Sequence, residues 1–90
     1  MNKENIKEYI KREKEILDKE FELVEQLCNL RKEHNISQQL LANMVGTKQP
    51  QIVRVEKRLH SPQLNTLLKI LDVYGYTIEF KKTRRNYESR

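Results

Sequence analysis

Apolar residues recur along the first third of the chain at helical spacing. The series Ile6, Ile10, Leu17, Val24, Leu27 and Leu30 proceeds mostly in steps of three, four and seven, which predicts an amphipathic helix. Asn5 with Glu8 matches a capping box, so the helix is predicted to begin at Asn5. Because Asp18 is also a capping residue type, the pattern allows one long helix or two helices that break near residues 17–19. Residues 1–20 are highly charged and sparsely apolar, and we interpret them as a solvated N-terminal helical arm.

Residues 35–58 predict two short helices around a tight turn. Asn35 suits a left-handed C-cap that closes the first helix, and Ser37 suits the N-cap of the helix "QQLLANMV". Gly46 is predicted to end that helix in a left-handed conformation. Pro50 falls in the first turn of the following helix, "KQPQIVRVEKR", where its missing N–H costs little.

The C-terminal third predicts one more helix and a strand. Ser61 and Pro62 form an N-cap and N1 pair that would open the helix "PQLNTLLKILDVYG", and Gly75 would close it. In residues 76–82, "YTIEFKK", two polar and two apolar side chains alternate, which are Thr77 and Glu79 against Ile78 and Phe80. A lone strand has unpaired edges, so we expect the same strand of a second copy to pair with it across a dimer axis. Residues 83–90 are predicted to be a basic tail.

The spacing around Gly46 is that of a helix-turn-helix unit. A small residue, Ala42, stands where the second helix of such a unit crosses the first. The seam between the two helices is predicted to be filled by Leu41, Val45, Ile52 and Val55. The sequence therefore predicts a mainly α fold, with the helix-turn-helix domain over residues 21–75.

The net charge of +5 is unevenly distributed along the chain. Residues 48–90 carry ten basic and four acidic side chains, whereas residues 1–20 carry six of each and residues 21–47 carry two basic and three acidic ones. A basic half favours a polyanionic partner, of which nucleic acid is the commonest. A solubilising surface is the alternative that charge alone leaves open.

Several classes of function find no support in the 90 residues. The single cysteine, Cys28, offers neither an intramolecular disulfide nor a metal cluster, and His34 and His60 have no second ligand nearby in sequence. There is no glycine-rich phosphate loop and no pairing of nucleophile and base, so we expect no enzyme, cofactor or metal. No apolar run is long enough for a membrane span or signal core, which predicts a cytoplasmic protein without a membrane partner.

Residues 24–75 resemble the Xre/Cro-CI family of DNA-binding repressors. The segment "LRKEHNISQQLLANMVGTKQPQIVRVEK" carries the resemblance, and Pro62, Leu64 and "LLKIL" continue it. The resemblance implies a lambda-repressor-like bundle of four to five helices, here with the N-terminal extension and the C-terminal strand. It also implies a structural ion pair between Arg31 and Glu56. The chain departs from the family at Arg58, where a glycine is usual.

The resemblance also assigns expected DNA contacts. Base contacts are expected from the start and outward side of the third helix, at Lys48, Gln49, Pro50, Gln51, Val53 and Arg54. Phosphate contacts are expected from the start of the second helix and the end of the third, at Ser37, Gln38, Lys57 and Arg58. In the major groove, a glutamine amide can form two hydrogen bonds with adenine, and an arginine can form two with guanine. Base recognition would therefore explain why glutamines cluster around this turn.

Two functions from different classes remain. The first is a sequence-specific repressor that binds a two-fold operator in double-stranded DNA as a homodimer. The second is a protein-binding module, because the ending "LLKILDVYGYTIEFKK" resembles that of HigA- and HipB-type antitoxins, which repress their own operon and hold a toxin. The partner would then be a cognate toxin, such as a RelE-type RNase, and the arm would bind it or support the dimer. A phage-type repressor without a toxin partner is a further alternative.

Overall fold

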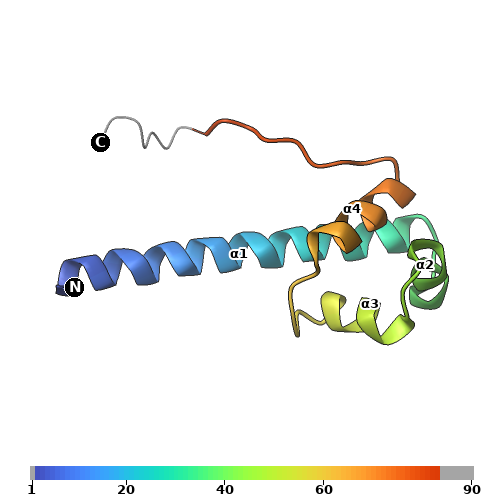
Figure 1. Cartoon of the computed structure of the whole chain (residues 1–90), viewed down its shortest axis with the longest axis horizontal. Coiled ribbons are helices and arrows are strands. Elements are labelled where there is room, and N and C mark those ends of the chain that lie inside the picture. Colours follow the sequence, from blue (N-terminus) through green and yellow to red (C-terminus); the bar gives the residue numbers. More distant parts are fainter. Residues whose placement is uncertain (1, 84–90) are drawn as a thin grey trace.

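Four helices make up the fold in the computed structural model, which describes residues 2–83. They are α1 (Lys3–Glu33), α2 (Gln38–Val45), α3 (Gln49–Glu56) and α4 (Leu64–Val73). In Figure 1, α2, α3 and α4 gather around the C-terminal part of α1, and the rest of α1 extends away from them as a rod. The expectation of a mainly α helix-turn-helix bundle is confirmed over these residues.

The first helix is longer than the sequence suggested. The side chain of Asn2 accepts a hydrogen bond from the backbone N–H of Asn5 at 2.8 Å, so the helix begins at Lys3 and the predicted start at Asn5 is wrong. The helix is continuous through residues 17–19, and the ion pair between Lys14 and Asp18 (3.0 Å) lies next to the predicted break. The arm and the first helix of the domain are therefore one element.

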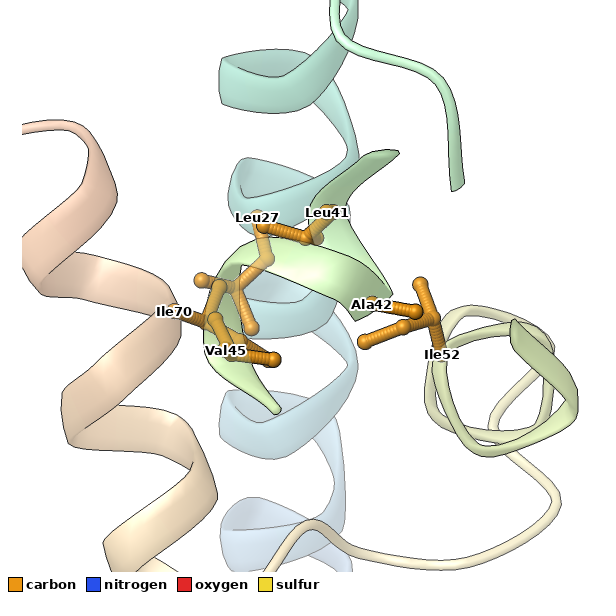
Figure 2. Packing of buried hydrophobic residues seen from close by; sticks show 6 residues of the cluster. All are labelled: Leu27, Leu41, Ala42, Val45, Ile52 and Ile70. Atoms are coloured by element: carbon orange, nitrogen blue, oxygen red, sulfur yellow. The ribbon is translucent and has the colours of Figure 1, made fainter. Parts of the chain in front are cut away.

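The core lies where the four helices meet and contains no part of the arm. Figure 2 shows its central cluster, to which every helix contributes, namely Leu27, Leu41, Ala42, Val45, Ile52 and Ile70. Ala42 is completely buried and faces Ile52, which is 2% exposed. A larger side chain at Ala42 would push α3 off α2, which is why this crossing requires a small residue.

Local backbone requirements shape the connections on both sides of α2. Asn35 and Gly46 both adopt left-handed conformations, with φ of 54° and 75°, as the sequence predicted. The hydroxyl of Ser37 accepts a hydrogen bond from the backbone N–H of Leu40 at 3.0 Å, which caps α2. The turn after Gly46 is closed by the N–H of Thr47, which donates to a carbonyl of α2 at 2.9 Å. Helix α3 therefore leaves α2 in a fixed direction.

The start of α4 differs from the prediction. The helix begins at Leu64 rather than Pro62, and Gln63 occupies the N-cap position. Ser61 caps nothing, because its hydroxyl donates a hydrogen bond to the carboxylate of Glu20 on α1. A tertiary partner 41 residues upstream has replaced the local capping role.

The segment after α4 has no regular secondary structure within residues 76–83. Gly75 turns the chain with φ of 83°, and the N–H of Tyr76 closes the end of α4 by donating to the carbonyl of Leu71 at 2.9 Å. Ile78 is 41% exposed and Phe80 is fully exposed. A strand requires a partner strand, and residues 2–83 contain none, so the predicted strand and its pairing stay predictions. The predicted basic tail falls, except for residue 83, outside the described residues.

Candidate nucleic-acid interface

Helix α3 presents two opposite faces. Ile52 and Val55 point into the core, where both are buried. The predicted base-contacting residues lie at the start of the helix and on its outer side: Lys48, Pro50, Gln51 and Arg54 are exposed, and Gln49 and Val53 are half-buried. All six are therefore grouped on one short, well-anchored element, as a helix that enters a major groove requires.

A cluster of polar side chains fixes α3 against α1 and α2. Arg31 of α1 donates from Nε to Oε2 of Glu56 at 2.7 Å and from Nη2 to Oε1 at 2.9 Å, a bidentate pair at the end of α3. Its Nη1 donates to the carbonyl of Ile36 at 3.0 Å. From α2, Nε2 of Gln38 donates to the same Oε1 of Glu56 at 3.0 Å. Because one carboxylate joins three helices, it holds the outer face of α3 in one orientation.

The environment of Glu56 favours its ionised form. Burial raises the pKa of this carboxyl, but the hydrogen bonds from Arg31 and Gln38 and the charge of Arg31 outweigh burial, so the pKa lies below its usual value of 4.5. The hydrogen bond to Glu56 also raises the pKa of Arg31. Both side chains are almost covered, at 13% and 11% exposed. Solvent therefore screens the pair only weakly.

We expect the protein to lose stability in acid through Glu56. Since its folded pKa is depressed, its stabilising contribution is complete above about pH 5.5 and is lost as the pH falls below 4.5 and through the folded value. Thermal melts between pH 7 and pH 3 should show Glu56→Gln to be roughly 1–3 kcal/mol less stable than the parent at pH 7. The difference should shrink toward pH 3. A gap between the two proteins that stays constant over this range would contradict the role of the ionised carboxylate.

The predicted phosphate contacts at the start of α2 already have intramolecular roles. Ser37 caps α2, and the amide nitrogen of Gln38 is bonded to Glu56. Ser37 is exposed and Gln38 is half-buried. The sequence identified the positions of both residues, but it did not show that Gln38 joins the ion pair.

The predicted phosphate contacts after α3 lie on a turn with an unusual backbone. Lys57 is exposed and follows α3 directly. Arg58 adopts φ of 60°, the left-handed conformation for which the family glycine is suited. Its guanidinium carbon lies 5.0 Å from the centroid of the Phe21 ring on α1. Sequence reasoning missed Phe21, because its spacing of four from Leu17 and three from Val24 places it on the apolar side of α1 and gives no sign of a separate partner.

Other kinds of site find no support within residues 2–83. No group of three histidine, cysteine or acidic side chains there could hold a metal ion. Burial raises the pKa of the Cys28 thiol, which disfavours the reactive thiolate. No helix of the described part of the chain is both long and apolar enough to cross a membrane.

Comparisons with known proteins agree with this geometry. A family model described as helix-turn-helix (HTH_3) matches residues 29–81, more than half of the chain. A Haemophilus influenzae protein described as an uncharacterized HTH-type transcriptional regulator is 42% identical over 62 residues, which cover 69% of this chain and 63% of that relative. The chain thus matches somewhat less than two thirds of the relative's length. No solved structure gives a significant match.

Proposed function

The chain belongs to the helix-turn-helix family of the Xre/Cro-CI type, and from this premise we propose that it is a sequence-specific DNA-binding transcriptional regulator. The observation that carries the proposal is the outer face of α3, where amide and cationic side chains are exposed opposite a fully buried face. A protein of this kind binds rather than catalyses, so it is not an enzyme and no catalytic residue is assigned. The similarity to a relative named as a transcriptional regulator supports the same conclusion.

The chemistry of this face suits base recognition in the major groove. Gln49 and Gln51 each carry an amide that can both donate to and accept from adenine, and Arg54 can donate two hydrogen bonds to guanine. Val53 offers methyl groups to a thymine methyl. Lys48 and Pro50 complete the face at the start of the helix. The cluster around Glu56 keeps these side chains in register with α2, whose N-terminus would meet the adjacent phosphate.

Arg54→Ala and Lys57→Ala should weaken DNA binding in different ways. Because Arg54 lies on the base-reading side, its loss should cost roughly 1–3 kcal/mol on the best operator and relax the preference at one position of each half-site. Lys57 would neutralise a phosphate, so its loss should weaken all duplexes alike and reduce the salt slope by about one unit. An operator selected from random duplexes, followed by competition binding at several salt concentrations, measures both effects. Equal losses on all sequences for both variants would contradict this division of roles.

We propose that the regulator acts as a homodimer on a two-fold operator. Residues 76–82 support this, because the segment has an alternating pattern but no partner strand within residues 2–83. Ile78 lines a groove of about 620 Å³ with Leu23, Leu30 and Leu71, and Phe80 beyond it is fully exposed. Antiparallel pairing of two such segments would cover both apolar residues.

A second candidate function is that of an antitoxin, favoured by the exposed apolar side chains on the arm. The free part of α1 carries Ile6, Ile10, Ile16 and Leu17, each more than 40% exposed. A binding protein such as a RelE-type RNase would bury them. If the neighbouring gene encodes a small RNase of this type, calorimetric titration should detect a complex that Ile6→Glu with Ile10→Glu abolishes while operator affinity is unchanged. A complex whose affinity is unchanged by both substitutions would exclude the arm as the toxin-binding site. The absence of any complex would exclude this partner.

A further inference from the structure

The loop that follows α3 is anchored to α1 outside the core. The Arg58 guanidinium lies over the Phe21 ring at 5.0 Å, and the Ser61 hydroxyl donates to the Glu20 carboxylate. Between these two contacts lies a hollow of about 150 Å³, which Leu17 and Val24 also line. Two adjacent residues of α1 thus hold both ends of a four-residue segment that leaves α3.

The contact with Phe21 restricts Arg58 without occupying its hydrogen-bonding groups. A ring that covers one face of a guanidinium leaves the N–H groups, which lie in the guanidinium plane, able to donate to a phosphate. The left-handed backbone of Arg58 fixes the direction in which its side chain leaves the chain. A free arginine would lose rotamer entropy on binding a phosphate, and one already held by a ring loses less.

We propose that Phe21 and Glu20 are positioning residues for a contact between Arg58 and the DNA backbone. This inference rests on the proposed DNA-binding function. Phe21 preorients the guanidinium, and Glu20 holds Ser61 so that residues 58–61 keep one shape beside the groove that α3 enters. The N-terminal part of α1, which precedes the segment matched by the family model, thereby contributes to DNA affinity without contact with DNA.

If Phe21 had a purely structural role, its loss would lower the folding stability rather than the DNA affinity. Phe21 and Arg58 are both exposed, and neither belongs to the core cluster. An exposed contact of this type adds little to folding stability. Loss of Phe21 should therefore weaken DNA binding and leave the melting temperature close to that of the parent.

The test is a double-mutant cycle on the full chain with the selected operator duplex. Phe21→Leu should weaken binding by about 2- to 5-fold per half-site, the range expected for an exposed cation–π contact. Phe21→Tyr, which keeps an aromatic face, should bind like the parent. Arg58→Gln keeps a side chain at the same left-handed position and should reduce the salt slope by about one unit. The Phe21→Leu substitution should then cause no further loss in the Arg58→Gln background.

Each other outcome has a definite meaning. If the parent binds no duplex in a salt-dependent manner, the proposed function fails and this inference fails with it. If the parent binds and Phe21→Leu binds equally well, only the inference fails. Losses of affinity that add up independently in the double variant would also overturn the inference. So would a Phe21→Tyr variant that binds more weakly than the parent.

Discussion

Replacing Ile52 with alanine should lower the free energy of unfolding by about 2–5 kcal/mol. Ile52 is the largest fully buried side chain among the described residues, and it faces the side chain of Ala42 on α2 (Figure 2). The cavity left by the substitution cannot close easily, because the methyl group of Ala42 is too short to move into it. Small domains have stabilities toward the low end of about 5–15 kcal/mol, so a loss at the upper end of the expected range would leave the variant partly unfolded at room temperature.

Urea titration followed by circular dichroism measures this effect. The matched control is Val53→Ala, which truncates the neighbouring residue on the outer side of α3. Val53 is only half-buried, so this variant should unfold within about 1 kcal/mol of the parent. An Ile52→Ala midpoint equal to that of Val53→Ala would contradict the packing in which α3 presses Ile52 into the core.

The parts of the fold that the sequence predicted well are those set by local backbone geometry. Gly46 and Asn35 stand where the chain turns left-handed, and few residue types adopt that conformation at low cost. Ala42 was predictable because a crossing of two helices needs a small residue. These requirements act within a few residues, so they leave a signature in residue type.

The predictions that failed, and the contacts that were missed, involve partners far away in sequence. Ser61 has the residue type of an N-cap, but Glu20 on α1 takes its hydroxyl instead. The hydrogen bond from Gln38 to Glu56 was not foreseen either, because no local pattern places these two side chains together, and the phosphate contact of Gln38 stays a prediction. The start of α1 failed for another reason, since Asn2 and Asn5 are equivalent caps in sequence and the longer helix gains an extra turn.

Arg58 illustrates how a departure from a family pattern becomes informative once the structure is known. The family glycine serves a left-handed residue, and the chain keeps that conformation with an arginine. The strain costs on the order of 1 kcal/mol. The sequence revealed the departure but not its partner, because Phe21 lies 37 positions upstream on another helix.

The largest functional loss should come from removal of residues 77–90. We expect a chain that ends after Tyr76 to fold, because the N–H of Tyr76 that closes α4 is retained and the core cluster lies upstream. It should be a monomer, since the proposed pairing of two C-terminal segments is lost. A dimer places two α3 helices in successive major grooves roughly 34 Å apart, and this tethering raises affinity by about 10²- to 10⁴-fold. The truncated chain should therefore bind duplex weakly and lose most of its preference for the operator.

The truncation also removes basic residues, so it needs a control that keeps them. Ile78→Pro in the full chain preserves the charge but removes a backbone N–H from the centre of the proposed strand. Sedimentation should find both variants monomeric at micromolar concentration and the parent dimeric. Ile78→Pro should retain more non-specific DNA binding than the truncated chain, because it keeps Lys81 and Lys82 and the arginines that follow. A truncated chain that remains dimeric would move the main interface away from residues 76–82, and the exposed apolar side chains of the α1 arm would then be the next surface to test.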